Sequence, residues 1–295
     1  GNVAVVAEVN SETDFVAKNE TFQEFVQTVA DTALASDLNG GANGEDIEAL
    51  LATNGLSDLL VEKTATIGEK LSVRRFAKVT GDVVTSYIHG GGRIGVIIAA
   101  NGAADDAAKE AITNIAMQVA AMNPQYISRN DISDEELAKL REITVDSALN
   151  DATTLPKPIL NKLIDKAINE KLWSDDDINN FNEHKNNMNY VWNFLSDAAK
   201  AKLGELAMAD KESIVAEKMF NGLVEGRVSK QLKEICLLDQ TYVKAEDGKQ
   251  SVAKYLESVS KDLTITEMVR FEVGEGMEKK QEDFAAEVAA QMAGV

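Results

Sequence analysis

The first fifty residues combine two hydrophobic periods. A mostly β-branched run over 3–9 ends in the turn-forming sequence 10–14, which predicts a buried strand. Apolar residues then recur at steps of three and four as far as Asn39-Gly40-Gly41, which predicts an amphipathic helix. The apolar positions of this helix are Phe22, Phe25, Val26, Val29 and Ala33. A shorter helix is expected over 46–51.

The next pattern is that of a meander of strands. Alternating residues over 71–79 predict a strand with one polar face. The strands expected over 83–89 and 93–100 are separated by little more than Gly90-Gly91-Gly92, and so short a linker forces them into an antiparallel hairpin. A helix is expected over 104–122. Because strand, turn and amphipathic helix occur twice in this order, we expect two related α+β subdomains rather than one sheet.

From 133 to 238 the pattern is helical. Leucine and isoleucine stripes recur at helical spacing, glycines are few, and no segment is a strand candidate. Such stripes leave one face that must be covered, so we expect a helical hairpin or a small bundle. Strand character returns over 268–273, and a terminal helix carrying Phe284 is expected after it. The helical region is therefore expected to be inserted into the second subdomain.

Together these patterns predict the α+β fold class, with two related core subdomains whose small antiparallel sheets are flanked by helices, an inserted helical hairpin or coiled coil, and a C-terminal helix. The expected boundaries are 1–80 for the N-terminal core subdomain, 81–132 and 229–273 for the two parts of the C-terminal core subdomain, 133–228 for the inserted helical region, and 274–295 for the C-terminal helical module. The chain opens at Gly1 inside an expected strand, so we expect the numbered sequence to be a fragment or a processed product.

The charge balance narrows the functional classes. With 49 acidic and 30 basic side chains, the formal net charge is −19, which excludes a generic binder of the phosphate backbone, and no direct nucleic-acid contact is expected. The longest apolar runs fall far short of the ~20 residues of a membrane span, so no membrane contact is expected. A single cysteine, Cys236, cannot form an internal disulfide, which fits a reducing compartment, and the expected location is cytoplasmic.

Two short motifs resemble ligand sites without completing them. Gly90–Gly95 fits the spacing G-x-G-x-x-G, but a strand rather than a helix follows it, so a hairpin turn is favoured over a phosphate site. Asp175-Asp176-Asp177 resembles the start of a calcium loop, but Asn180 and Asn186 stand where glycine and glutamate are needed. Acidic residues at the start of a helix, where the helix dipole favours them, are the preferred interpretation.

The remaining reactive side chains form no catalytic pattern. The two histidines, His89 and His184, are far apart in the chain, and Cys236 lies on an apolar stripe as a small core residue would. We therefore expect no metal site, no cofactor and no catalytic residue, and the chain is not predicted to be an enzyme.

An aromatic residue beside a carboxylate stands where the first strand turns into a helix, in Thr13-Asp14-Phe15-Val16. In one interpretation Thr13 or Asp14 caps the helix and Phe15 folds back onto the core as a hydrophobic staple. In the other, Phe15 protrudes as a wedge, and an exposed aromatic in a partner's pocket contributes on the order of 2 kcal/mol or more. His89, at the end of a hairpin strand, poses the same choice. Composition alone favours the first interpretation for both residues.

The sequence around this turn, Glu8-Val9-Asn10-Ser11-Glu12-Thr13-Asp14-Phe15-Val16-Ala17-Lys18, resembles the signature of the translation elongation factor Ts family. Further stretches that look like family motifs follow in order along almost the whole chain. They are Ile67-Gly68-Glu69-Lys70 with Arg74-Arg75, Ser86-Tyr87-Ile88-His89 with Arg93-Ile94-Gly95-Val96, Gln118–Pro124, Lys218-Met219, Glu225-Gly226-Arg227, Arg270–Gly276 and Asp283–Ala290.

This resemblance implies a guanine nucleotide exchange factor that binds elongation factor Tu, in its GDP-bound and nucleotide-free forms, and speeds GDP release during translation elongation. In the family an Asp-Phe pair, matched here by Asp14 and Phe15, enters between two helices of the GTPase domain near the magnesium site. Other residues match family contact positions, and the terminal helix is similar to a module that also touches the GTPase domain. The expected partner-binding residues are Thr13, Asp14, Phe15, Val16, Ile67, His89 and Phe284.

Two departures from the family pattern leave alternatives open. The family's small N-terminal helical domain, which contacts the same partner, has no counterpart in these 295 residues, so the alternative function is a binding or scaffold module that holds elongation factor Tu without efficient exchange. The helical insertion is longer than the family's short coiled-coil hairpin, and residues 155–210 have no obvious counterpart there. The insertion is either a lengthened surface hairpin or an aid to homodimerisation or partner contact.

Overall fold

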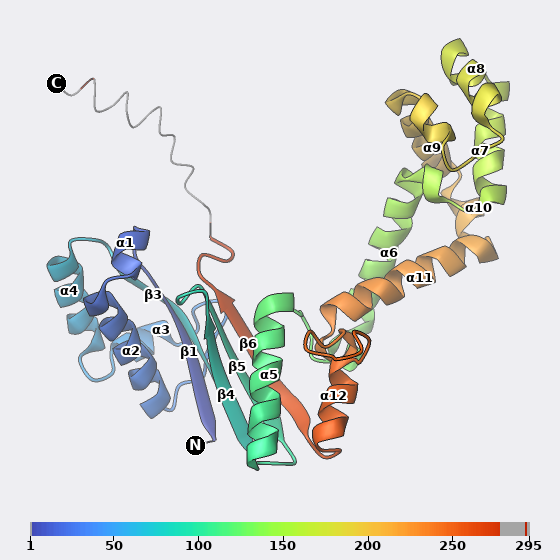
Figure 1. Ribbon diagram of the computed structural model, residues 1–295. Coiled ribbons are helices and arrows are strands. Elements are labelled where there is room, and N and C mark those ends of the chain that lie inside the picture. The colour runs from blue at the N-terminus through green and yellow to red at the C-terminus, as the bar shows by residue number, and fades with distance from the viewer. Residues whose placement is uncertain (1, 278–292, 294–295) are drawn as a thin grey trace. The chain divides into compact units, whose positions relative to one another are not determined.

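The computed structural model describes residues 2–277 and residue 293, and the chain divides into two compact units. The first unit contains residues 1–127 and 241–295, and the second contains residues 128–240 (Figure 1). Helices and two small antiparallel sheets occur together, so the α+β fold class is confirmed. The finer boundaries expected at 80, 132, 228 and 273 stay a prediction.

The first unit carries all the strands of the described residues. Its elements in chain order are β1 (Val3–Asn10), α1 (Asp14–Ala17), α2 (Glu20–Ala35), β2 (Gly40–Gly41), α3 (Ile47–Leu51), α4 (Leu56–Ile67), β3 (Ser72–Thr80), β4 (Val83–His89), β5 (Ile94–Asn101), α5 (Asp106–Met122), α12 (Val252–Val259) and β6 (Thr264–Glu272). The strands form two antiparallel sheets in the orders β1-β3-β2 and β4-β5-β6. β5 and β6 pair in one sheet, although residues 128–240, which form the second unit, lie between them in the sequence. The helical unit is therefore an insertion between two strands of one sheet.

The hairpin between β4 and β5 has the geometry that its glycines predict. His89 lies opposite Ile94, and the three residues that join them to form the turn, Gly90, Gly91 and Gly92, have φ values of 63°, 68° and 98°. These values fall in the left-handed region, which glycine adopts without the steric cost that a Cβ atom brings. The hairpin interpretation of this glycine-rich motif is therefore confirmed.

The helices cover the sheets with the faces that the apolar pattern predicts. α2 packs on β1 and buries Phe22, Phe25, Val29 and Ala33, so its predicted stripe is confirmed. α5 packs on β4 and β5. An apolar cluster joins residues of both sheets, and its buried members are Ala4, Val6, Ala77, Val79, Ile97, Ala99 and Phe271.

Helix α4 was not predicted from the sequence. Leu56 is its one fully buried residue, and Leu59, Leu60 and Ile67 pack half-buried against the core of the first sheet. These positions recur at helical spacing, so a local signal for this helix is present in the sequence. Glycines in the left-handed conformation flank it, Gly55 at its start and Gly68 at its end. The loop between α4 and β3 carries Glu69.

The second unit is a helical bundle, as expected, and among its described residues no segment forms a strand. Its elements are the α-helices α6 (Asp134–Asn150), α7 (Lys157–Asn169), α8 (Asp175–His184), α9 (Asp197–Ala209), α10 (Lys211–Val215) and α11 (Lys218–Ile235), with 3-10 turns η1 (Arg129–Asp131), η2 (Ala152–Thr154), η3 (Val191–Phe194) and η4 (Leu237–Asp239). These helices share one apolar core, in which the indole nitrogen of the buried Trp173 donates to the carbonyl oxygen of Ala199 at 3.0 Å.

The acidic run in this bundle is a helix start, as the sequence favoured. Ser174 caps α8 by accepting a hydrogen bond from the amide of Asp177. The buried carboxylate of Asp177 in turn accepts hydrogen bonds from the amide and the hydroxyl of Ser196, at 2.9 and 2.7 Å. Burial alone would raise the pKa of Asp177, but these bonds and one from the Ser174 hydroxyl lower it.

A buried ion cluster connects β1, β3 and the turn after β6. Glu8 is 2 % exposed, and its Oε1 accepts a hydrogen bond from Arg75 Nε at 2.7 Å. Its Oε2 accepts from Arg74 Nη1 at 3.0 Å and from the amide of Gly274 at 3.1 Å. The Arg75 guanidinium lies 4.2 Å from the ring centroid of Phe271, so the same cation also packs on an aromatic face.

We expect Glu8→Gln to destabilise the first unit strongly at neutral pH, because it leaves the guanidinium of Arg75 buried without its counter-charge. The expected loss is about 3 kcal/mol in the free energy of unfolding. Urea midpoints of the β1 amides, read by pulsed hydrogen exchange, measure this loss in the first unit alone. The exposed Glu62→Gln is the matched control.

The difference in free energy of unfolding between the wild type and Glu8→Gln is expected to depend on pH. Burial alone would raise the pKa of Glu8, but the bonds from Gly274, Arg74 and Arg75 outweigh it and lower the pKa. A lowered folded pKa stabilises the protein fully above the unfolded value of about 4.3, and this stabilisation is lost as the pH falls through the folded pKa. The gap between wild type and Glu8→Gln should therefore shrink below about pH 4, and a gap that stays constant down to about pH 2 would contradict the assignment.

Candidate functional site

The signature sequence forms a single helical turn between β1 and α2. Thr13 has an extended backbone, and its hydroxyl accepts a hydrogen bond from the amide of Val16 at 3.4 Å, which makes it the N-cap of α1. After the turn, the amide of Lys18 donates a hydrogen bond to the carbonyl oxygen of Val16. The side chain of Asn19 then caps the start of α2. Two successive caps within seven residues confine α1 to one turn, because each cap fixes where a helix begins.

This turn displays its aromatic residue to solvent. Phe15 is 88 % exposed, whereas its neighbour Val16 is half-buried against the core of the first sheet. The capping part of the first sequence interpretation is therefore right for Thr13, and its staple part is wrong for Phe15. In a one-turn helix Val16 faces the core, so the adjacent side chain, rotated by about 100°, points away from it.

A carboxylate far away in sequence anchors the turn. Glu69 Oε2 accepts hydrogen bonds from the amides of Glu12 and Thr13, both at 3.1 Å. Its Oε1 accepts from the hydroxyl of Thr13 at 2.6 Å. The Thr13 side chain thus bonds both to the start of α1 and to Glu69, and the turn that carries Phe15 is held from two sides. Sequence reasoning missed this role, although Glu69 lies in one of the motifs it singled out.

The other predicted contact residues lie in different surroundings. Ile67 is the last residue of α4 and lies half-buried against the core of the first sheet. It is two residues from Glu69, whose carboxylate anchors the turn. His89 is exposed at the end of β4, with its Nδ1 2.8 Å from the hydroxyl of Tyr87. Phe284 lies outside the described residues.

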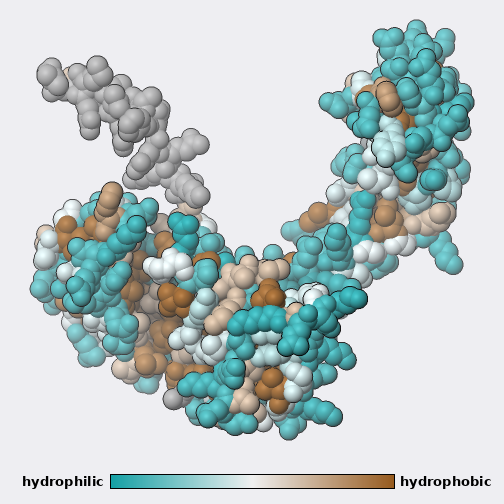
Figure 2. Space-filling view, viewed as in Figure 1, coloured by the Kyte–Doolittle hydropathy of each residue, from teal (hydrophilic) through white to brown (hydrophobic). Residues whose placement is uncertain are grey.

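A groove of about 880 Å³ connects the turn with the hairpin end. Its lining includes residues 5–10 of β1, residues 11–14 of the turn, and Ile88 with residues 91–93. His89 is not in the lining, although the preceding residue, Ile88, is. Figure 2 shows hydrophobic side chains gathered on the face between α2 and α5, where β1 and β4 lie.

The described residues hold no group of three or more histidine, cysteine or acidic side chains placed to bind a metal ion. No helix within the described part of the chain is long and apolar enough to cross a membrane. The site offers an exposed aromatic ring, that of Phe15, beside the exposed carboxylate of Asp14, on a turn whose backbone is hydrogen-bonded to Glu69.

We expect Glu69→Gln to loosen this turn without unfolding the unit, because Gln keeps one acceptor oxygen and Glu69 is bonded to exposed groups. Charge-assisted bonds are roughly twice as strong as neutral ones, so the Glu12 and Thr13 amides should exchange with solvent about tenfold faster. Hydrogen exchange read by NMR measures this, with Glu62→Gln as the control. Unchanged exchange of both amides would show that the carboxylate does not hold the turn.

Comparison with known proteins agrees with the motifs. The family model described as elongation factor TS matches residues 12–275. Elongation factor Ts of Clostridioides difficile (strain 630) is 39 % identical over 299 aligned positions, which cover 98 % of this chain and 76 % of that protein. The match begins within the Phe15 turn region and extends through the ion-cluster turn at 272–275, so it spans both units. The chain belongs to the elongation factor Ts family.

Proposed function

We propose that this chain is a guanine nucleotide exchange factor for elongation factor Tu, which promotes GDP release during translation elongation in the cytoplasm. The observation that carries the proposal is the exposure of Phe15, 88 %, on a turn anchored by Glu69. A large apolar side chain held in water gains free energy when a partner covers it, and a turn that is already ordered loses little entropy on binding.

In the proposed mechanism, Phe15 enters between two helices of the GTPase domain near the magnesium site, and Asp14 fixes the displaced arrangement. For this to release nucleotide, the factor must bind the nucleotide-free GTPase more tightly than the GDP-bound one. Reciprocity follows from linkage: the factor by which this chain weakens GDP binding is the factor by which GDP weakens binding of this chain. Rapid release and later recycling are therefore one coupling free energy.

The remaining predicted contacts are assigned around this wedge. Thr13 and Val16 hold the turn that presents it, and Ile67, His89 and Phe284 are proposed as further contacts with the partner. Position supports Ile67, because it is two residues from the carboxylate that anchors the turn. A role of the helical unit in homodimerisation or partner contact stays a prediction.

The test is stopped-flow release of a fluorescent GDP analogue from elongation factor Tu, with catalytic amounts of this chain. We expect Phe15→Ala to slow exchange by about thirtyfold, since removing a buried aromatic at an interface costs about 2 kcal/mol. The matched control is Phe194→Ala, which removes a half-exposed phenylalanine of the helical unit, 46 % exposed, and should leave the rate unchanged.

The outcomes separate exchange from mere binding. Strong acceleration by the unmodified chain that Phe15→Ala abolishes supports the wedge. No acceleration, with binding retained in a titration, would leave the alternative of a binding or scaffold module. If the unmodified chain and Phe15→Ala accelerate GDP release equally, the role of Phe15 is refuted and the exchange function is kept.

A further inference from the structure

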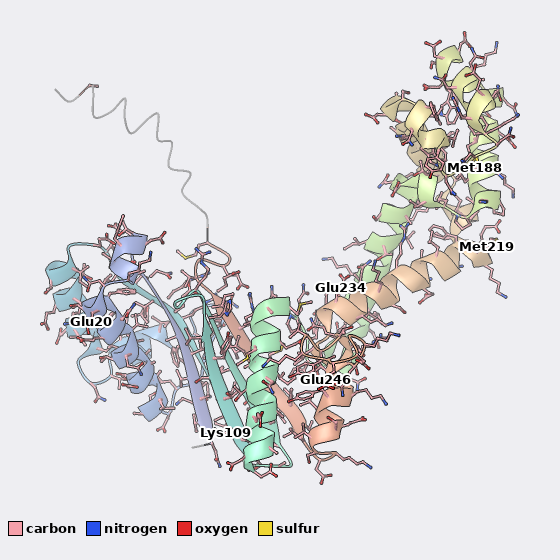
Figure 3. All side chains as sticks on the ribbon, in the orientation of Figure 1. Glu20, Lys109, Met188, Met219, Glu234 and Glu246 are labelled. Atoms are coloured by element: carbon pink, nitrogen blue, oxygen red, sulfur yellow. The ribbon has the colours of Figure 1, made fainter. Side chains whose placement is uncertain are left out.

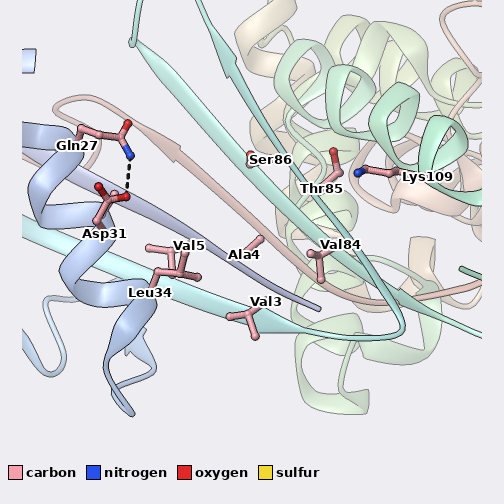
Figure 4. Close-up of a pocket in the computed structure, with 11 residues that line it drawn as sticks. Val3, Ala4, Val5, Gln27, Asp31, Leu34, Val84, Thr85, Ser86 and Lys109 are labelled. Carbon is pink, nitrogen blue, oxygen red and sulfur yellow. Dashed lines mark hydrogen bonds between the residues drawn. The ribbon is translucent and has the colours of Figure 1, made fainter. Parts of the chain in front are cut away.

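The groove beside the Phe15 turn continues along the unit and has no occupant among the described residues. A second hollow of about 400 Å³ shares Val5, Gln27, Ala30 and Ser86 with it and extends past Val3 to Lys109. α2 lines one side of the combined groove, and α5 contributes Lys109 on the other, where Figure 3 labels it. Figure 4 shows Val3, Ala4 and Val5 of β1 along the second hollow, with Gln27 donating to Asp31 at 2.9 Å on the α2 side.

The walls of this groove suit an apolar helix. Ile88, Val273 and Met277 line it and are each about half exposed or more, at 62 %, 51 % and 49 %. Small residues allow close approach at other points: Ala7, Ala17 and Ala30. Exposed apolar side chains gathered along one groove are costly in water, so they indicate a surface that is covered in use.

The end of the described chain lies at the mouth of the groove. The last residues before position 278 line it, and Met277 Sδ accepts a hydrogen bond from Asn10 Nδ2 at 3.4 Å, at the end of β1. The continuing sequence, 278–295, therefore starts where the groove starts. Its apolar residues Phe284, Val288 and Met292 recur at every fourth position, which is the spacing of a helical stripe.

Length also matches. The eighteen residues 278–295 would span about 27 Å as a helix at 1.5 Å per residue. The eight residues of β1 along the groove span about 26 Å. The segment carries four acidic and two basic side chains, so the apolar stripe rather than charge would hold it in the groove.

We propose that residues 278–295 dock into this groove of their own chain in the free protein, with Phe284, Val288 and Met292 facing β1. This inference is independent of the exchange function. If both hold, docking keeps Phe284 on its own body until the partner binds, so the segment adds a step between the free and the bound protein.

Thiol reactivity in the full chain tests the proposal. Gln27→Cys places a thiol in the groove, and Thr28→Cys places one at the next, also exposed, position of α2 that lines neither hollow. The native Cys236 gives a low background, because it is buried and burial raises the pKa of its thiol. With a bulky maleimide, we expect Gln27→Cys to react about fivefold more slowly than Thr28→Cys, a ratio that corresponds to about 1 kcal/mol of docking free energy.

Charges added to the segment then identify the occupant. Phe284→Glu should raise the rate at Gln27→Cys by about fivefold and leave Thr28→Cys unchanged. Ala286→Glu adds the same charge on the opposite side of the stripe and should change neither rate. The proposal is overturned if Phe284→Glu has no effect on Gln27→Cys. It is equally overturned if protection rises with protein concentration, which assigns the groove to a second copy, or if protection arises only after elongation factor Tu is added, which assigns it to the partner.

Discussion

The buried carboxylate of Glu8 is the constraint on which the first unit depends. A carboxylate that is 2 % exposed is destabilising by several kcal/mol unless it is paired and hydrogen-bonded. Here the partners come from two separate segments, the adjacent arginines of β3 and the amide of Gly274. Only one relative position of these segments satisfies all of them, so the cluster fixes the end of β1 against both β3 and the turn that follows β6. The turn that carries Phe15 begins six residues after Glu8, so the cluster also fixes where this turn starts.

Holding an aromatic residue in water requires a rigid support. If the turn around Phe15 were free, hydrophobic contact would draw the ring back onto the core, which is what a staple does. The Thr13 cap and the Glu69 carboxylate prevent this by using the backbone amides that a rearranged turn would need. The packing of Val16 occupies the core-facing direction. The arrangement keeps contact area available for a partner at a low entropy cost of binding, which is the property that an exchange factor acting by differential binding needs.

The helical unit is stabilised independently of these features. Its apolar core draws only on residues between 128 and 240, and its buried polar side chains, such as Asp177, are bonded within the same segment. A unit with its own core and with both ends entering at one place can vary in length without altering the sheet into which it is inserted. This explains how β5 and β6 remain neighbours although the whole helical unit separates them in sequence.

The sequence by itself determined the elements whose signals are local. The stripe of α2, the three glycines of the hairpin and the acidic run at the start of α8 each act within a few residues, so periodicity, turn chemistry and the helix dipole were enough to predict them. The family motifs added the position of the site. The tertiary structure alone decided that Phe15 points outward and that Glu69 bonds to Thr13 across 56 residues. These depend on which distant groups compete for the same amides and the same core volume, and no window of neighbouring residues contains that information.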